Sequence, residues 1–401
     1  MHLMHTSGRM PRLPRLEAPG KYFPLGGPVP PEDLVGRERY IQASVERLLD
    51  GQNLLVAGPR RIGKTSVMFE VLRRLRKKGA YTAYVDVLGA TSLRGLGERL
   101  ADALLQNQTG LARSMEHAKA LAAGAKLTAK VRYEHLELAV ELARETNEMK
   151  FFEAALDLPQ ALATRAKRRV VVIFDEFQAA GRLHPRVFDI MRARIQPQRA
   201  VAYAFLGSEA GLLEALFTTK SEPFYRFAVA HDLADPAGHR FGIDPEDWHL
   251  YIRKKLGARG ITMSEALVDE LLDRTGGHPQ DTMQVCAELY YFMRDAGVRT
   301  VTMQLLTLAY EQALRELERA FALVWAELGK QKYQQAVAKR VGRSEVLFQS
   351  TTELPRLEVL RALDAMRARG LVLRVGRGRY EFVEPMFAEY VRRLDSAVMA
   401  P

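Results

Sequence analysis

The apolar and polar positions of the first 240 residues follow the rhythm of strands that alternate with helices. Five short apolar runs have the length of buried strands, and they occupy residues 54–57, 81–87, 170–174, 200–206 and 229–233. Positions with a helical period lie before or between them, at 38–50, 66–75 and 185–195. Alternation of this kind predicts an α/β fold, in which helices flank a mostly parallel sheet.

After residue 240 the pattern becomes helical. Four helices are expected at 245–257, 264–275, 279–296 and 303–317, and they predict a helical lid at 241–317. Beyond 317, two or three helices lead to another at 355–369, and two short alternating strands follow around a glycine-containing turn within 370–383. Because a small hairpin follows a helix, the sequence predicts a winged helix-turn-helix at 318–401.

Less regular sequence precedes and interrupts the predicted core at 35–240. Residues 1–34 are rich in proline and glycine, and 26–31 cannot form a helix or a central strand, so an extended arm is expected. An Ala/Leu-rich stretch at 92–165 has the composition of a mostly helical insert. Within it, residues 126–136 partly alternate between apolar and polar, so a strand or hairpin is the alternative to helix there.

The first candidate site lies between the strand at 54–57 and the helix that follows it. The chain there has the GxxxxGK[ST] pattern of a phosphate-binding loop, in the strand–loop–helix context that the pattern requires. Glycines at both ends let backbone N–H groups curl around a phosphate, Lys64 can reach the β- and γ-phosphates, and the Thr65 hydroxyl can bind Mg²⁺. The candidate nucleotide-binding residues are Gly58, Pro59, Arg60, Arg61, Ile62, Gly63, Lys64, Thr65 and Ser66.

A pair of acidic residues, Asp175 and Glu176, ends the apolar strand at 170–174. Ligands of open α/β sheets bind at the carboxyl ends of the strands, so both carboxylates are expected beside the phosphate loop. Asp175 can hold Mg²⁺ together with Thr65, and Glu176 can polarise the attacking water. The two motifs together predict that the chain binds a nucleoside triphosphate with Mg²⁺.

Composition narrows the class of protein. The single cysteine, Cys286, excludes an intrachain disulfide and a multi-cysteine metal site. Residues 1–16 lack the apolar stretch of a secretory signal, and no apolar run reaches the length of a membrane span, so a cytoplasmic protein without a membrane partner is expected. The net charge of +11 is compatible with nucleic-acid binding, but an arginine-rich solvated surface explains it equally well.

The order of motifs along the chain resembles one protein family. It runs from Val35-Gly36-Arg37-Glu38 through the phosphate loop, Asp175-Glu176 and Gly207-Ser208 to Gly276-Gly277-His278-Pro279 and the terminal hairpin. This order resembles the AAA+/STAND-type ATPases, and within them the archaeal-type ATPases related to the origin-recognition initiators. The resemblance covers nearly the whole chain except 92–165, and it implies that the nucleotide is ATP.

The resemblance also implies roles for residues outside the phosphate loop. Val35 and Gly36 would pack near the adenine, with the arm covering the base. Ser208 would act as the sensor that contacts the γ-phosphate, and Pro279 would touch the nucleotide from the lid. A GTPase would carry an Asn-Lys-x-Asp loop, which this sequence lacks.

Arg226 stands where this superfamily usually carries an arginine finger, which acts on the nucleotide of a neighbouring subunit. That role would make the protein a homo-oligomer. However, Tyr225 precedes it where similar proteins tend to have glycine, and a structural ion pair is the alternative reading of Arg226. The lid motif also lacks an arginine, and His278 is expected to begin a helix rather than to act in catalysis.

The sequence leaves two candidates, DNA and a protein, for the partner that the C-terminal residues bind. Between 330 and 395 the chain has 14 Lys and Arg against 8 Asp and Glu, including arginines on the predicted hairpin and on the helix before it. Such residues could bind the phosphates of double-stranded DNA. The predicted function is an Mg-ATP-dependent switch coupled to DNA; the alternative is a slow or non-hydrolysing ATP-dependent scaffold that recruits a protein. The arginines are Arg361, Arg367, Arg369, Arg374, Arg377 and Arg379.

Overall fold

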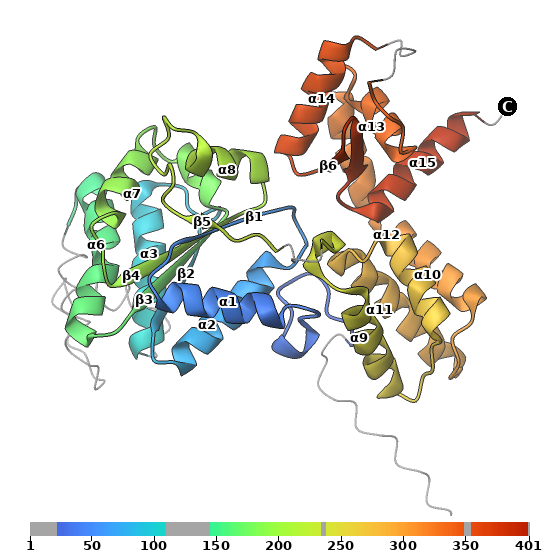
Figure 1. The fold of residues 1–401 in the computed structure, drawn as a ribbon, viewed down its shortest axis with the longest axis horizontal. Helices are drawn as coiled ribbons and strands as arrows, with labels where there is room; N and C mark the ends of the chain where they lie inside the picture. The colour runs from blue at the N-terminus through green and yellow to red at the C-terminus, as the bar shows by residue number, and fades with distance from the viewer. Residues whose placement is uncertain (1–21, 110–144, 234–237, 349–353, 400–401) are drawn as a thin grey trace, which may run out of the picture.

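The computed structural model describes residues 22–109, 145–233, 238–348 and 354–399 of the 401-residue chain. The expected hairpin at 126–136 and the first 21 residues of the arm lie outside these ranges. Three parts are visible in Figure 1: a sheet flanked by helices, a helical lid beside it, and a C-terminal unit above the lid. In the described chain no helix combines the length and apolar character that a membrane crossing requires.

A five-stranded parallel sheet forms the centre of the first part, and it confirms the predicted α/β class. Its strands stand in the order β2-β3-β4-β1-β5, so β4 separates the strand of the phosphate loop from the acidic strand. The last strand is shorter than expected, because it pairs with only two residues of β1 before the chain leaves the sheet. The strands are β1 Leu54–Ala57, β2 Tyr81–Asp86, β3 Val170–Asp175, β4 Val201–Gly207 and β5 Val229–Ala230.

Both faces of the sheet are buried, which explains why its strands are apolar at successive positions. On β3, Val171 and Ile173 pack toward α1 and α2, whereas Val170, Val172 and Phe174 pack toward the helices of the opposite face. The sequence did not predict α8, which contributes to that second core. The helices are α1 Glu38–Leu49, α2 Lys64–Lys77, α3 Leu93–Thr109, α6 Glu148–Ala166, α7 Val187–Ile195 and α8 Ala210–Thr218.

The lid contains the four expected helices, but the last is much longer than predicted. Helix α12 has 27 residues and no proline or glycine before its final residue, so it continues through the expected boundary at 317/318 into the C-terminal unit. One hydrophobic cluster spans lid and C-terminal unit, and Phe321 of α12 contributes to it from the shared helix. The lid helices are α9 Pro245–Gly257, α10 Glu265–Thr275, α11 Pro279–Ala296 and α12 Met303–Gly329.

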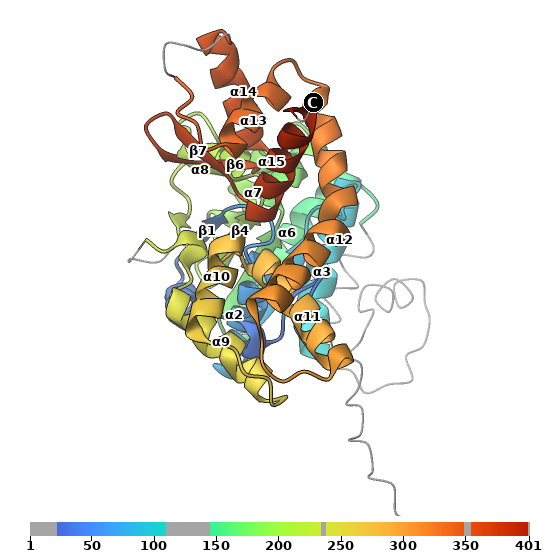
Figure 2. The ribbon, with the colours of Figure 1, turned by 90° about the vertical axis from the view of Figure 1, so that its right-hand side faces the viewer.

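In its described residues, 330–348 and 354–399, the C-terminal unit combines three helices with an antiparallel hairpin (Figure 2). As the sequence predicted, the hairpin β6–β7 follows a helix directly, and Gly378 makes its turn at a positive φ of 69°. Helix α15 was not predicted. The elements are α13 Gln334–Gly342, α14 Arg356–Ala368, β6 Val372–Gly376, β7 Arg379–Phe382 and α15 Pro385–Met399, and three short 3-10 helices lie elsewhere, at Pro31–Asp33, Phe177–Arg182 and Arg240–Gly242.

Candidate functional site

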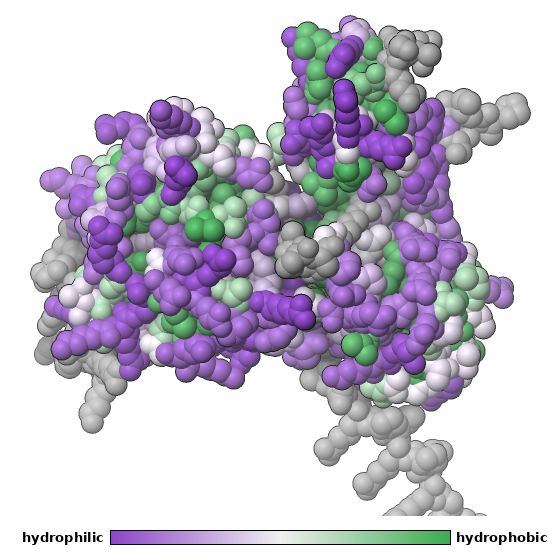
Figure 3. Space-filling view, viewed as in Figure 1, coloured by the Kyte–Doolittle hydropathy of each residue, from purple (hydrophilic) through white to green (hydrophobic). Residues whose placement is uncertain are grey.

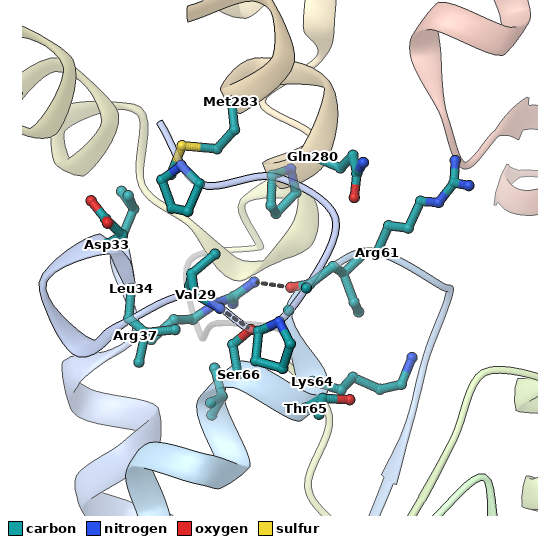
Figure 4. A pocket seen from close by; sticks show the side chains of 18 of the residues that line it. Val29, Asp33, Leu34, Arg37, Arg61, Lys64, Thr65, Ser66, Gln280 and Met283 are labelled. Carbon is teal, nitrogen blue, oxygen red and sulfur yellow. Dashed lines mark hydrogen bonds between the residues drawn. The ribbon is translucent and has the colours of Figure 1, made fainter. Parts of the chain in front are cut away.

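A pocket of about 500 Å³ lies where the arm, the phosphate loop, the carboxyl ends of the strands and the lid meet (Figure 4). Strand register brings the polar strand ends together, because Ala57 pairs with Gly207 and Asp86 with Asp175 at one edge of the sheet. The sequence-predicted residues that line the pocket are Val35, Arg60, Arg61, Ile62, Gly63, Lys64, Thr65, Ser66, Asp175, Glu176, Ser208 and Pro279.

The phosphate loop has the curled backbone that its glycines permit. Gly63 has a φ of 92° and immediately precedes α2, so the first free N–H groups of that helix face the pocket. Gly58 and Pro59 do not line the pocket; their carbonyl oxygens accept hydrogen bonds of 2.7 and 2.6 Å from the Lys64 ammonium. Burial of this ammonium lowers the pKa of Lys64 to about 8.

The lowered pKa of Lys64 predicts that nucleotide affinity depends on pH. Phosphate groups favour the charged ammonium, so binding should raise the pKa again and take up a proton whenever Lys64 is neutral in the free protein. Affinity should therefore be constant below pH 7 and fall above pH 8, approaching about tenfold per pH unit. Equilibrium ATP binding between pH 6.5 and 9.5 measures this, and Lys64→Met should remove the slope.

Two strand ends supply a pair of oxygen groups beside the phosphate loop. The Thr65 hydroxyl donates a hydrogen bond of 2.8 Å to Asp175 Oδ2, and the Tyr84 hydroxyl donates one of 2.5 Å to the same oxygen. Burial, followed by the charge of Asp175, raises the pKa of Tyr84, which keeps its phenol protonated and able to donate. Sequence reasoning missed Tyr84, because its position depends on β2 pairing with β3.

The Glu176 carboxylate bridges the ends of β3 and β4. Its Oε2 accepts hydrogen bonds from the Ser208 hydroxyl at 2.9 Å, the Ser208 amide at 3.2 Å and Gln178 Nε2 at 2.7 Å. The Ser208 hydroxyl in turn accepts one of 3.1 Å from Arg60 Nε. Burial alone would raise the pKa of Glu176, but these hydrogen bonds outweigh it and hold the pKa below its usual value. The carboxylate is therefore ionised and available as a base.

The arm lines the end of the pocket opposite the strand ends; that it covers the base of a nucleotide stays a prediction. Its backbone at Val29 donates a hydrogen bond of 3.1 Å to the Ser66 hydroxyl, which fixes the arm to the start of α2. Gly36 does not line the pocket; a Cβ there would lie 2.9 Å from Asp247 Oδ2, so this glycine permits close packing against α9. The arm and lid residues that line the pocket and that sequence reasoning did not assign are Pro24, Leu25, Gly26, Gly27, Pro28, Val29, Asp33, Leu34, Ile243, Trp248, Gln280 and Met283.

The motif Val35-Gly36-Arg37-Glu38, which follows the arm, contains one residue of the site to which sequence reasoning assigned no role of its own. Arg37 is buried, and its guanidinium donates hydrogen bonds to the carbonyl oxygens of Leu233, Gly242 and Ile62. These three oxygens belong to the end of the core, the start of the lid and the phosphate loop. Arg37 therefore ties the phosphate loop to the joint between core and lid, as Figure 4 shows for its bond to the loop.

The lid motif turns the chain into α11, and this turn brings Pro279 to the pocket. Gly276 and Gly277 both have positive φ, and the His278 side chain caps α11 by accepting from the Asp281 amide. His278 is fully buried, consistent with its expected role at a helix start. Arg226 is exposed beside Tyr225 and is not among the described residues that line the pocket.

The C-terminal unit contacts the phosphate end of the pocket. Arg61 of the phosphate loop points away from the pocket toward this unit (Figure 4) and forms an ion pair of 3.1 Å with Glu384. Gly370, with a φ of 68°, lies so close to the loop that follows β4 that a Cβ there would stand 3.1 Å from the Ser208 carbonyl oxygen. Between these contacts a second cavity of about 380 Å³ shares Arg60 and Arg61 with the pocket.

A family model matches the part of the chain that carries the phosphate loop and the acidic strand. Residues 34–230 match the family model described as an ATPase domain predominantly from Archaea. The Walker-type ATPase PABY2304 of Pyrococcus abyssi has a similar structure, with a TM-score of 0.64 and 16% identity over 92% of this chain and 99% of that one. A search of curated protein sequences finds no match.

A second solved structure shares the fold over nearly the full length. The ORC2 protein of Aeropyrum pernix, solved in ADPNP-ADP complexes, gives a TM-score of 0.55 at 14% identity, over 95% of this chain and 98% of that one. The ADP form of the same protein gives a TM-score of 0.50. At these identities the likeness shows a common fold, which includes the sheet, the lid and the C-terminal unit.

Proposed function

We propose that the chain is an Mg-ATP-dependent switch of the archaeal ATPase type, whose C-terminal unit responds to the nucleotide and binds DNA; the match of residues 34–230 to the archaeal ATPase family model and the fold shared with the ORC2 protein support this proposal. The main support is that this unit directly contacts the phosphate loop, through the ion pair of Glu384 with Arg61, and the loop after β4, where Gly370 packs against Ser208. An event at the γ-phosphate therefore reaches the C-terminal unit without any intermediate element.

The residues at the pocket fit ATP with Mg²⁺. Thr65 and Asp175 present a hydroxyl and a carboxylate oxygen 2.8 Å apart, and Mg²⁺ prefers such oxygen ligands. These two residues would hold the ion, which would neutralise charge on the phosphates. Tyr84 would orient Asp175 through its hydrogen bond. Lys64 would exchange its two loop carbonyls for phosphate oxygens when the nucleotide binds.

Hydrolysis would use residues already in position at the phosphate end. Glu176 would accept the proton of the attacking water, since its carboxylate is ionised and reaches the pocket. The Ser208 hydroxyl would contact the γ-phosphate, and Arg60, which already bonds to that hydroxyl, would add positive charge there. Val35 and Pro279 would contact the nucleotide from the arm side and from the lid.

The hairpin of the C-terminal unit has the charge of a surface that binds DNA phosphates. Arg374, Arg377 and Arg379 are exposed on the wing that β6 and β7 would form in a winged helix. Filter binding of double-stranded DNA, with and without ATP, tests the proposal. Retention of DNA that increases with ATP supports it, and absence of binding at low salt would reject DNA as the partner.

The exposed face of α14 favours the alternative partner, a protein. Leu357 and Leu360 are exposed there (Figure 3 shows hydrophobic side chains among hydrophilic ones on this unit), and they are 57% and 37% accessible. Arg361 is paired with Glu358 on the same helix at 2.7 Å, so its charge is partly neutralised. Co-purification of one discrete protein, lost in Lys64→Ala, would support the scaffold alternative.

Gly370→Ala is expected to weaken the link between nucleotide and C-terminal unit. The new Cβ would press on the Ser208 carbonyl, so the ratio of DNA affinities with and without ATP should move toward one. Gly297→Ala, at the end of α11 in the lid, is the matched control: Gly297 has nearly the same φ of 65°, and therefore about the same strain of 1–2 kcal/mol, but its Cβ would meet no atom within 4 Å. An equal effect of both variants would show that strain, and not the contact, is responsible.

Arg226 would act on the nucleotide of a neighbouring subunit, because its side chain is exposed and is not among the described residues that line the pocket of its own chain. In that case specific ATPase activity should rise with protein concentration in the wild type. Arg226→Ala should keep ATP affinity but lose this rise. Activity that is independent of concentration would leave Arg226 with a structural role.

A further inference from the structure

Gln178, which sequence reasoning did not single out, lies between the carboxyl ends of β3 and β4. Its Nε2 donates the shortest of the three hydrogen bonds to Glu176 Oε2, at 2.7 Å. We propose that Gln178 is a positioning residue for ATP hydrolysis, which holds the Glu176 carboxylate in place while Ser208 turns its hydroxyl to the nucleotide. This inference rests on the proposed function of the site.

The hydrogen-bond inventory of Ser208 explains why a second anchor is needed. A serine hydroxyl has one proton to donate, and here that proton goes to Glu176 Oε2, while Arg60 donates to the hydroxyl oxygen. If Ser208 senses the γ-phosphate, its proton must turn to a phosphate oxygen and leave the carboxylate. Glu176 would then lose one of its three donors at the moment when it must face the attacking water.

Two donors remain on Glu176 in that state. The Ser208 backbone amide is the longer contact at 3.2 Å, and it belongs to the same residue whose hydroxyl would turn to the nucleotide. The Gln178 amide belongs to the same chain turn as Glu176, only two residues later, and Gln178 is not among the described residues that line the nucleotide pocket. Gln178 is therefore the donor that can keep the carboxylate in one orientation before and after ATP binds.

The packing around Gln178 fits a fixed amide. A Cβ at Gly207 would overlap Gln178 Oε1, so the glycine that ends β4 leaves the space in which the amide lies. The nitrogen must face Glu176, because the amide oxygen would repel a carboxylate. Oε1 is buried and has no hydrogen-bond partner in the described part of the chain. An unpartnered buried oxygen is costly, which indicates that the bond of its nitrogen matters.

A double-mutant cycle tests the proposal on the full-length chain. Gln178→Met keeps the length of the side chain and removes the donor, so kcat for ATP hydrolysis should fall about ten- to hundredfold while KM for ATP changes less than about twofold. In the Glu176→Gln background the same substitution should cost less than about twofold, because the group on which it acts is gone. Gln304→Met, at an exposed position of α12, is the matched control.

Each outcome decides. A loss of equal size in both backgrounds, or a rise in KM alone, would show that Gln178 only supports the fold. Gln178→Asn guards against misfolding of the methionine variant: its amide is about 1.5 Å short of Glu176, so kcat should again fall. A wild type no faster than Glu176→Gln overturns the proposed function, whereas an active wild type with an unaffected Gln178→Met overturns this inference alone.

Discussion

Replacement of Glu176 by glutamine is expected to lower kcat for ATP hydrolysis by about 100- to 10,000-fold, the range for loss of a general base. Glutamine has the size of glutamate and can keep the hydrogen bonds from Ser208, but it cannot accept the proton of water. ATP affinity should stay within about threefold of the wild type, because the carboxylate acts on the water and not on the nucleotide. Single-turnover hydrolysis and equilibrium binding, measured on the same preparation, separate the two quantities.

The matched control for this variant is Glu265→Gln, which removes an exposed carboxylate from the lid. It should hydrolyse ATP at the wild-type rate. If Glu176→Gln also hydrolysed ATP normally, the assignment of Glu176 as the base would be wrong, although the nucleotide pocket would stand. The trapped ATP state of Glu176→Gln would, in addition, be the form in which DNA or protein binding should be strongest.

Replacement of Lys64 by alanine is expected to abolish turnover and to weaken ATP binding by about ten- to hundredfold. The ammonium is buried at the phosphate end of the pocket, and hydrogen bonds to a charged group contribute about 1.5–3 kcal/mol. The loss should be larger for ATP than for ADP, since Lys64 would reach the γ-phosphate as well as the β-phosphate. Isothermal titration with both nucleotides measures the difference.

Lys77→Ala controls for the removal of a lysine from the same helix. Lys77 lies exposed at the far end of α2, so its replacement should leave both affinities unchanged. Equal binding of ATP by Lys64→Ala and the wild type would exclude the phosphate loop as the nucleotide site. The thermal stability of Lys64→Ala should not fall, because the substitution relieves the burial of a charged group.

The local elements were predictable where one segment carries its own signal. Leu54–Ala57 was predicted with its observed bounds because a buried strand is continuously apolar, and the helices 245–257 and 279–296 were predicted because proline begins each of them. The sequence did not predict α8, and it ended α12 at 317. Residues 318–329 continue the helical pattern of α12, but the prediction placed a domain boundary at 317/318 and so divided one helix between two domains.

That residues of contiguous motifs lie together in one pocket was predictable for the same reason. The phosphate loop and Asp175-Glu176 each follow a strand that the sequence itself predicts. Their chemistry also requires residue types that few other positions could supply. Tyr84, Gln178 and Arg37 were not assigned roles, since each acts on a partner from another segment. Their residue types are common, and only the strand order and the lid position give them a neighbour.

The sequence by itself determined the class of fold: a phosphate loop and an acidic strand end require only local order to predict a P-loop α/β protein. The tertiary structure decided how the parts are connected. It placed Gly370 against Ser208 and Glu384 against Arg61, and it joined lid and C-terminal unit in one core through α12. The physical reason is range: helix periods and loop patterns arise within a few residues, whereas the contacts of Gly370 with Ser208 and of Glu384 with Arg61 join residues more than 160 positions apart along the chain.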